Sequence, residues 1–305
     1  GQTFPWIFNP PATYWDGASV FLKHVIEKEG GPDKLKGKKI GLIHLDAPFG
    51  KEPIPYLEAM AKKYGFELKL YPVPADKMQD QSSQWLAIRR DRTDWIYNQG
   101  WGAMNPTAVK EAVKNNFPMD KFVNVWWAGG DDDARAGEAG AKGLKALTFN
   151  ASGADFPVIA DIRKHVVDKG LSKADKSKVG EQLYNRGVYN SMLIAEAIRT
   201  AQAITGKKAV TGEDVRRGLE GMNITEARLK EMGMEGFGST VKLSCADHSG
   251  HNKVFVVQWD GTKWDKPVAT ISPDTENVQP LLEAAAKDYV EKNSVPKRTE
   301  ACDAK

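Results

Sequence analysis

Two tryptophan-bearing segments, which begin 28 residues apart, carry the side chains best suited to hold a small molecule. They span residues 95–101 (WIYNQGW) and 123–129 (VNVWWAG). Each is a short apolar run that reaches a glycine and places indole rings near its carboxyl end. Open α/β sheets bind their ligands in a crevice at the carboxyl ends of their strands. The pattern therefore indicates a cleft with aromatic walls.

The three tryptophans at these strand ends allow two interpretations. Trp101, Trp126 and Trp127 either line the cleft as a group or cap the apolar core at the top of the sheet. If the adjacent pair lies in a strand, only one of its two rings faces the cleft, because neighbouring side chains alternate between the faces. Further candidates are loop aromatics and amides that could hold a carboxylate: Tyr14, Phe49, Asn98, Gln99 and Asn105.

Residues of metal-binding type occur in two clusters, and neither has the spacing of a metal site. The segment 245–251 (CADHSGH) offers four such residues from one element, whereas zinc takes ligands in pairs from two elements. Asp131, Asp132 and Asp133 are adjacent and cannot all face one ion on regular backbone. They are better suited to begin a helix and complement its dipole. We expect no metal.

Enzymatic chemistry finds no support in the motifs. None of the five histidines has zinc-protease spacing or stands beside a Gly-x-Ser-x-Gly turn. The loop after the apolar run 39–45 is not a Gly-x-Gly-x-x-Gly loop, and its Pro48 lacks the backbone N–H that a phosphate would use. We expect no catalytic residues and no nucleotide cofactor.

The residues between these motifs predict a parallel sheet. Strand-like runs begin at Lys39, Glu67, Trp95 and Phe122, at offsets of 28, 28 and 27 residues, with helical apolar periodicity between them. Right-handed crossovers then give a parallel α/β sheet with helices on both faces.

The remaining segments predict a second lobe that is mostly helical. Residues 4–11 resemble a strand ended by two prolines, residues 156–167 and 179–204 resemble helices, and Thr211 with Asp214 predicts a capped helix start. Residues 253–264 predict a β-hairpin whose turn contains Asp260-Gly261. Pro106 is expected at a first helical position, and the long helix is expected to have one apolar stripe: Leu183, Met192, Ala195 and Ile198.

Length and charge narrow the class of protein. A chain of 305 residues favours two lobes. The 43 basic and 40 acidic residues are interspersed, so no nucleic-acid footprint is present. No apolar run reaches the roughly 18 residues of a membrane span, and no leader with a cleavage site is visible.

The two cysteines, Cys245 and Cys302, are separated by 57 residues. If they pair, the bridge would anchor a polar tail, contribute roughly 4 kcal/mol on the chain-entropy model and imply an oxidising compartment. The alternative is two free thiols in a reducing compartment.

Several motifs resemble one protein family. Residues 4–15 (FPWIFNPPATYW), 80–90 (DQSSQWLAIRR) and 100–108 (GWGAMNPTA) are similar to the periplasmic substrate-binding components of ABC transporters of the leucine/isoleucine/valine-binding type. Residues 185–187 (NRG) and 244–248 (SCADH) extend the likeness over nearly the whole chain.

The resemblance implies a type I periplasmic binding protein: α/β, with two doubly wound parallel-sheet lobes joined by a three-segment hinge and with lobe 1 incomplete in this chain. Family members carry a further N-terminal segment before the position of Phe4. The implied divisions are 1–13 for the end of lobe 1 and the first crossing, 14–148 for lobe 2, 149–240 for helices of lobe 1, 241–275 for a return to lobe 2, and 276–305 for a C-terminal helix and tail.

The resemblance also implies a role: a bacterial protein of the periplasm, with its signal peptide removed, that closes on a solute and delivers it to an ABC permease. It implies no cofactor, no nucleic acid and no membrane insertion, and we expect a monomer. Carried onto this sequence, the ligand-contacting residues are Tyr14, Phe49, Asn98, Trp101, Trp126, Trp127, Ala128 and Tyr184.

One departure from the family bears on the ligand. Amino-acid binders in the family place a carboxylate near the position of residues 127–129 to hold the ligand ammonium, and here these residues are Trp-Ala-Gly. A buried ammonium without a partner is strongly disfavoured. We therefore expect an aromatic or branched aliphatic acid without an α-amino group. Amino acids are the alternative, because Asp131 to Asp133 stand close by in sequence; a sensory receptor domain of the same fold and an α/β enzyme are less favoured.

Overall fold

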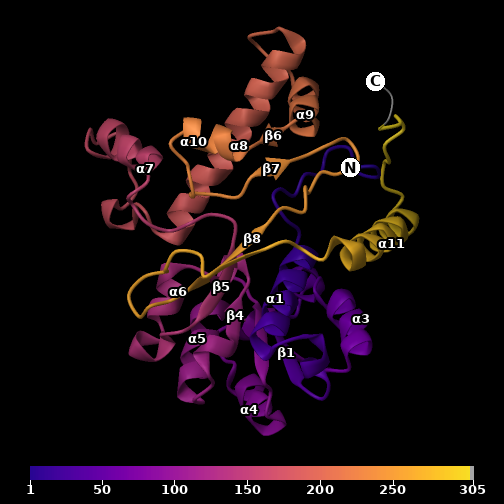
Figure 1. The fold of residues 1–305 in the computed structure, drawn as a ribbon, viewed down its shortest axis with the longest axis vertical. Coiled ribbons are helices and arrows are strands. Elements are labelled where there is room, and N and C mark those ends of the chain that lie inside the picture. Colours follow the sequence, from indigo (N-terminus) through magenta and orange to yellow (C-terminus); the bar gives the residue numbers. More distant parts are fainter. Residues whose placement is uncertain (303–305) are drawn as a thin grey trace. The chain divides into compact units, whose positions relative to one another are not determined.

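The structure, a computed structural model, describes residues 1–302 and divides into two compact units. Unit 1 comprises residues 1–13, 153–253 and the chain from Thr275, and unit 2 comprises residues 14–152 and 254–274. Figure 1 shows the labelled elements of both units. None of the helices among residues 1–302 combines the length and the apolar character that a membrane crossing needs.

Unit 2 is built on a seven-stranded sheet in the order β2-β1-β3-β4-β5-β8-β9. The strands are β1 Lys39–Leu45, β2 Glu67–Val73, β3 Trp95–Gln99, β4 Phe122–Asn124, β5 Lys145–Thr148, β8 Val254–Gln258 and β9 Ala269–Ile271. The first five are parallel, and β8 and β9 join antiparallel at one end. This architecture confirms the predicted α/β fold class, including the strand starts at 39, 67, 95 and 122.

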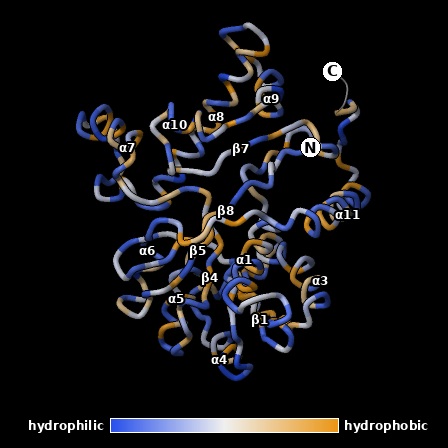
Figure 2. Tube along the Cα trace, in the orientation of Figure 1, coloured by the Kyte–Doolittle hydropathy of each residue, from blue (hydrophilic) through white to orange (hydrophobic). Residues whose placement is uncertain are grey.

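Burial along the strands follows their places in the sheet. The interior strand β3 is buried at every residue, as expected for a parallel strand covered on both faces. The edge strand β2 is half exposed and contains Pro72, which an edge tolerates because no ladder partner needs its missing N–H. In Figure 2 the apolar colour runs through the centre of unit 2, while its helices alternate between polar and apolar.

Helices cover both faces of this sheet. One face carries α1 Tyr14–Glu29 and α3 Ile54–Tyr64, with the Phe21 ring of α1 stacked on Tyr97 of β3 at 4.9 Å. The other face carries α4 Ser82–Asp91, α5 Met104–Lys114 and α6 Asp131–Arg135. Their apolar side chains share one buried cluster with Ile96 and Phe122 of the strands. Short elements connect them: η1 Pro32–Leu35, α2 Pro48–Lys51, η2 Ala75–Lys77, η3 Met119–Lys121, η4 Trp126–Ala128 and η5 Glu138–Ala141.

Unit 1 is mainly helical. It contains α7 Pro157–Ile162, which continues as a π-helix η6 Arg163–Val167, η7 Lys176–Lys178, α8 Gln182–Thr205, α9 Gly212–Glu220, α10 Glu226–Glu231 and α11 Thr275–Asn293. Its described residues form one two-stranded antiparallel sheet, β6 Asn223–Ile224 with β7 Val241–Lys242. The capped start of α9 is as predicted: the Thr211 hydroxyl accepts from Asp214 N, and the Asp214 carboxylate accepts from Thr211 N.

Helices α8 and α9 pack closely because of a glycine. A Cβ at Gly218 would approach the Ala197 carbonyl oxygen to less than 3.0 Å, a separation that Cβ atoms do not adopt. The buried side of α8 includes Met192, Leu193 and Ala201. The predicted stripe is therefore wrong for three of its four residues: Met192 is buried, whereas Leu183, Ala195 and Ile198 are exposed.

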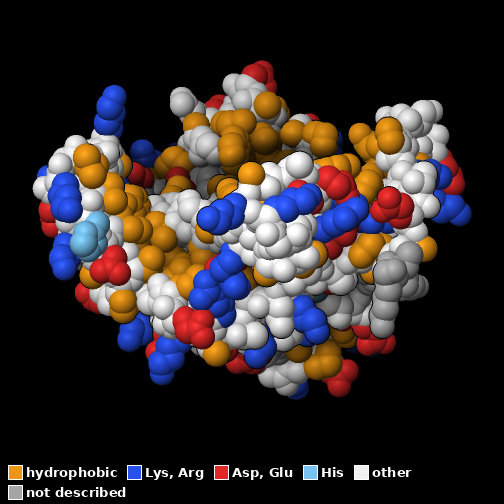
Figure 3. Space-filling view, turned by 90° about the horizontal axis from the view of Figure 1, so that it is seen from above, with side chains coloured by type: hydrophobic (Ala, Val, Ile, Leu, Met, Phe, Trp, Pro, Cys, Tyr) orange, Lys and Arg blue, Asp and Glu red, His pale blue; other side chains and the backbone are white. Residues whose placement is uncertain are grey.

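Exposed apolar side chains are a feature of unit 1. Leu183, Ile194 and Ile198 on α8 are 46%, 62% and 37% exposed, and Leu171 is 72% exposed. The space-filling view in Figure 3 shows apolar side chains gathered in patches on the face seen from above.

Two further local predictions are corrected and one is confirmed. Residues 4–11 form a turn and extended backbone with a cis Pro10–Pro11 bond, and none of these described residues lies in a strand. Helix α5 begins at Met104, two residues before Pro106. The predicted hairpin at 253–264 forms: the Asp260 N–H donates to the Lys263 carbonyl, and β9 then pairs with β8. The end of the predicted tail, residues 303–305, lies outside the described residues.

Candidate functional site

The predicted aromatic residues of unit 2 meet at the carboxyl-end edge of its parallel strands. Phe49 lies in α2 directly after β1, Trp101 follows β3, and Trp127 lies in η4 after β4. Tyr14 begins α1. Parallel strands present their carboxyl ends at one edge, so these segments converge although they are far apart in sequence.

These four side chains form one connected group, here called the aromatic face: Tyr14, Phe49, Trp101 and Trp127. The Trp101 and Trp127 rings are 5.5 Å apart at 70°, and the Phe49 and Trp101 rings are 6.3 Å apart at 72°. Tyr14 meets Phe49 edge-on at 4.9 Å. The Trp127 Nε1–H donates to the Tyr14 hydroxyl at 2.6 Å, which fixes two of the four rings to each other.

Exposure separates this face from the neighbouring core. Trp101 is 49% exposed, and Tyr14, Phe49 and Trp127 are half-buried. An exposed indole supported edge-on by other rings can stack on an apolar ligand. The aromatic face thus presents one exposed ring and three half-buried rings on the side of unit 2 that holds the strand ends.

Trp126 belongs to the core beneath the aromatic face. It is only 4% exposed, stacks on Tyr14 at 5.1 Å and meets Phe149 at 5.8 Å. Helix α1 approaches it closely, because a Cβ at Gly17 would lie 2.9 Å from the Trp126 ring. Each of the two interpretations of the tryptophans thus fits a different residue. Trp101 is exposed, Trp126 is packed in the core, and Trp127 is half-buried.

Trp126 and Trp127 do not lie in a strand. Strand β4 ends at Asn124, and residues 126–128 form a 3-10 turn. The strict alternation of a strand therefore does not apply to the pair. Ala128, the third residue of this turn, is fully buried, and its N–H donates to the Val125 carbonyl at 2.8 Å. The ligand contact predicted for Ala128 stays a prediction.

The amides are buried and engaged within unit 2. Asn98 Nδ2 donates to Asn124 Oδ1 at 2.9 Å, Gln99 Nε2 donates to the Phe49 carbonyl at 3.4 Å, and Asn105 Nδ2 donates to the Trp127 carbonyl at 2.9 Å. All are at most 2% exposed. A ligand carboxylate could reach Asn98 only after this packing opened, and the predicted contact of Asn98 with ligand stays a prediction.

The acidic residues begin helix α6, as expected. Asp131 is 6% exposed, and the Asp133 carboxylate accepts from Gly130 N at 3.3 Å. Burial raises the pKa of Asp133 to about 7, although hydrogen bonds from Gly130 and the Asn105 side chain act in the opposite direction. Asp133 is therefore held by donors of the protein itself.

Tyr184 lies on α8 of unit 1 and is half-buried. Its predicted contact with ligand stays a prediction.

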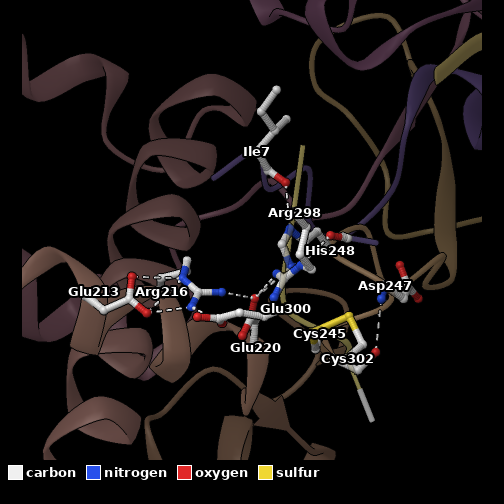
Figure 4. Close-up of a disulfide and its surroundings, with 12 residues drawn as sticks. Ile7, Glu213, Arg216, Glu220, Cys245, Asp247, His248, Arg298, Glu300 and Cys302 are labelled. Atoms are coloured by element: carbon white, nitrogen blue, oxygen red, sulfur yellow. Dashed lines mark hydrogen bonds and ion pairs between the residues drawn. A yellow bond between two sulfur atoms is a disulfide. The ribbon is translucent and has the colours of Figure 1, made fainter. Parts of the chain in front are cut away.

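The two cysteines form a disulfide, which confirms the first of the two alternatives, a bridge between them. Cys245 and Cys302 have Cα atoms 5.3 Å apart and close a sequence separation of 57 residues. Figure 4 shows the surrounding ion pairs of unit 1, in which the Glu220 carboxylate binds Arg298, Arg216 and His248. Burial acts to raise the pKa of Glu220, whereas its three partners act to lower it. The partners together outweigh burial, so the pKa lies below its usual value.

The segment 245–251 is a structural turn. The Asp247 carboxylate accepts from Ser249 N and Gly250 N at 2.9 and 2.8 Å. The His248 ring stacks on Phe8 at 3.8 Å, with its Nδ1 2.9 Å from the Ile7 carbonyl oxygen. Among residues 1–302, no group of three or more histidine, cysteine or acidic side chains is placed to hold a metal ion.

Two residues near the aromatic face were not predicted from the sequence. Phe149, at the end of β5, packs against Trp126, and Gly17 makes room for the same ring. Gly17 carried a usable signal, because a glycine inside a helix costs stability and so indicates close packing. Phe149 had none beyond its apolar type.

Comparison with known proteins identifies a family and solved structures that this chain resembles. Residues 1–263 match the family described as periplasmic binding protein. A crystal structure described as an ABC transporter permease from the Pseudomonas fluorescens group is 38% identical, with a TM-score of 0.90, and the match covers 98% of this chain and 72% of that one. No curated protein sequence matches the chain.

More distant structures share the fold alone. A branched-chain amino acid ABC transporter from Thermus thermophilus with bound valine is 18% identical, with a TM-score of 0.71 and coverage of 91% of this chain and 69% of that one. A solute-binding protein from R. palustris in complex with benzoate is 13% identical, with a TM-score of 0.59 and coverage of 85% and 64%.

The family match and the 38% identity over almost the whole chain agree with the two-unit α/β structure. Proteins of this family bind solutes and are not enzymes. The chain belongs to the periplasmic binding protein family.

Proposed function

We propose that the protein is the solute-binding component of an ABC uptake transporter and that it captures a small carboxylic acid with an aromatic or branched aliphatic body. The observation that carries the proposal is the aromatic face of unit 2, in which a 49% exposed Trp101 is braced by Trp127 and Phe49.

The exposed indole of Trp101 is the reason for proposing a ligand with an apolar body. Removing apolar surface from water gains roughly 25 cal/mol per Å², and stacked aromatic rings add about 0.5 to 1.5 kcal/mol. A flat or branched hydrocarbon group against Trp101 would collect both contributions. A polar ligand body would lose its hydration there without gaining hydrogen bonds of comparable free energy.

The acidic residues explain why an α-amino group is disfavoured. Residues 127–129 provide no carboxylate, and the nearby Asp133 accepts from Gly130 N and has a pKa raised to about 7 by burial. An ammonium at this position would have to compete with these internal donors. A ligand without an amino group avoids the cost of burying an unpaired charge.

The distant structural neighbours are compatible with either ligand class. One is described with bound valine and another with benzoate, so the fold accepts ligands with and without an ammonium group. An amino acid is the second candidate, because Asp131 and Asp133 follow Trp127 within six residues. For either ligand, we propose that the protein acts as a monomer in the periplasm and delivers its solute to an ABC permease.

Native mass spectrometry of the protein purified from bacterial periplasm tests the proposal. We expect an adduct whose accurate mass corresponds to an acid containing only carbon, hydrogen and oxygen, and we expect it to be lost on unfolding and dialysis. An adduct with the composition of an amino acid would refute the ligand class while leaving the solute-binding role intact. Turnover of the adduct by the purified protein would refute the binding role itself.

A further inference from the structure

Three buried carboxamides lie directly beneath the aromatic face. Asn98 and Asn124, opposite each other in β3 and β4, are fully buried and joined by the 2.9 Å hydrogen bond between them. Asn105, near the start of α5, is 2% exposed. Polar side chains this deeply buried are costly unless they are bonded, so their partners define what they do.

Asn105 is seated against a glycine. A Cβ at Gly100 would approach both Asn105 Oδ1 and Asn98 Oδ1 to less than 3.0 Å, which Cβ atoms do not tolerate. Neither oxygen has a conventional hydrogen-bond partner. Both oxygens therefore occupy the space in which any residue other than glycine would place its Cβ. The glycine thus gives Asn105 the room to reach the segment after β4.

The amide nitrogen of Asn105 holds that segment. It donates at 2.9 Å to the carbonyl of Trp127, in a single 3-10 turn whose last carbonyls have no partner within the turn. The same side chain also lowers the pKa of Asp133 by hydrogen bonding, so it acts on both η4 and α6.

Trp127 transmits this constraint to the aromatic face. Its Nε1–H donates to the Tyr14 hydroxyl at 2.6 Å, and its ring lies 5.5 Å from the ring of Trp101. Rotation or displacement of the Trp127 backbone would break the first contact and move the second. The orientation of two of the four rings therefore depends on where the Trp127 carbonyl is held.

We propose that Asn105 is a positioning residue: its carboxamide, seated on Gly100, holds the Trp127 carbonyl and thereby sets the geometry of the aromatic face. The relevance of that geometry to solute binding rests on the proposed function. The positioning itself does not, and it is measured without any ligand.

The indole N–H signals in ¹⁵N–¹H NMR spectra of the full chain provide the test. Trp127→Phe and Trp95→Phe assign two of the cross-peaks, and Tyr14→Phe gives the Trp127 position when the hydrogen-bond acceptor is removed. In Asn105→Ala we expect the Trp127 cross-peak to move most of the way toward its position in Tyr14→Phe. The Trp95 indole, which donates to Glu29 at 2.7 Å in the same unit, should keep its position.

A matched control lies on the same helix. Asn115, the C-cap of α5, also donates its amide to a backbone carbonyl, that of Glu111 at 2.8 Å, but away from the aromatic face. Asn115→Ala should leave both cross-peaks in place. Asn105→Leu keeps the shape of the side chain without a buried polar group and should shift the Trp127 peak as the alanine variant does, even if the alanine variant does not fold.

Three results would overturn the proposal. They are an unmoved Trp127 cross-peak in a folded Asn105 variant, an equal movement of the Trp127 and Trp95 cross-peaks, and failure of both Asn105 variants to fold. The second and third would show that Asn105 supports unit 2 as a whole. None of them bears on whether the protein binds a carboxylic acid, so the two proposals fail independently.

Discussion

At the scale of single residues, Trp101 and Trp126 differ in exposure although both lie near the aromatic face. Trp101 is 49% exposed with rings on one side, whereas Trp126 is 4% exposed and packed between Tyr14 and Phe149. Both follow the carboxyl ends of strands, and their sequence contexts are alike. We propose from this difference in exposure that Trp101 contacts ligand and that Trp126 stabilises the core.

We expect Trp101→Ala to weaken ligand binding by about 1 to 3 kcal/mol, because it removes a stacking surface, and to change the melting temperature little. Trp126→Ala should instead lower the free energy of unfolding by about 3 to 5 kcal/mol, because it empties a packed site. Titration calorimetry and thermal unfolding of both variants measure this contrast. Unchanged affinity with a lowered melting temperature in Trp101→Ala would mark that ring as core.

Asp133 gives the protein a pH-dependent stability. Burial raises its pKa from 3.8 to about 7, so between these values the folded state holds the proton more tightly than the unfolded state. Stability from this group is therefore present at low pH and is lost as the pH rises toward 7. The loss is at most about 4 kcal/mol, at roughly 1.4 kcal/mol per pKa unit.

Asp133→Asn should remove that loss. We expect the variant to be more stable than the wild type at pH 8 and to approach it at pH 4, as measured by urea unfolding at both values. Asp76→Asn, which replaces an exposed carboxylate on η2, should show no such pH-dependent gain. A gain of equal size at pH 4 and pH 8 would show that the effect comes from packing and not from the charge.

Sequence could predict which residue types gather at the strand ends, but not how each side chain is used. Phe49, Trp101 and Trp127 meet as expected because parallel strands share an edge. The ligand contact predicted for Asn98 stays a prediction; in the structure this side chain is buried and donates to Asn124. The direction of a carboxamide depends on a neighbour in another strand, which a single-strand pattern does not contain.

At the scale of elements, the regular spacing of βα repeats made the sheet of unit 2 predictable. Offsets of 28, 28 and 27 residues place β1 to β4 because each repeat must supply one strand and one covering helix. The buried side of α8 was not predictable in the same way. Its apolar residues occur on more than one side, and the close approach of α9 at Gly218 decides which of them are buried.

Helix α1 contains a buried histidine that should make unit 2 sensitive to acid. His24 is fully buried, neither ring nitrogen has a hydrogen-bond partner, and burial together with Lys145 and Lys28 lowers its pKa to about 4. The unfolded chain therefore binds the proton more tightly. The stability from neutral His24 is present above pH 6.5 and is lost as the pH falls toward 4, by roughly 3 kcal/mol.

We expect His24→Leu to reduce this acid sensitivity, because leucine fills the site without a titrating group. The measurement is the free energy of unfolding from pH 7 to pH 4, with His165→Leu as a control at an exposed histidine on η6. If the wild type and His24→Leu lose stability in parallel over this range, His24 is not the group responsible.

At the scale of the whole molecule, the two ends of the described chain are fastened together within unit 1. The Arg298 N–H donates to the Thr3 carbonyl and its Nε donates to the Gly1 carbonyl, both at 3.0 Å. Arg298 also binds Glu220 on α9, and Cys302 is bonded to Cys245. The disulfide therefore secures a tail whose arginine holds the first residues.

Replacing both cysteines, Cys245→Ser with Cys302→Ser, should lower the free energy of unfolding of unit 1 by roughly 4 kcal/mol, because the bridge closes a long loop. Urea unfolding with and without dithiothreitol measures the effect, and the reductant should change the wild type but not the double variant. Equal stability of reduced and oxidised wild type would contradict a stabilising role.

The pairing itself could be suggested but not decided from sequence. A cysteine in a polar tail needs an anchor, yet free thiols fit the sequence equally well. The ion pair of Glu220 with Arg298 has no signal in the sequence, because it joins α9 to a tail 78 residues further along the chain. Long-range electrostatic contacts leave no local pattern to read.

The most direct test of the proposed ligand class is titration calorimetry with pairs of compounds that differ only in the α-amino group: 4-methylpentanoate against leucine and 3-phenylpropanoate against phenylalanine, with benzoate included. We expect at least one acid without the amino group to bind at least tenfold more tightly than its amino-acid partner and to lose affinity in Trp101→Ala. Tight binding of leucine or phenylalanine, with no heat from the three acids, would contradict the proposal.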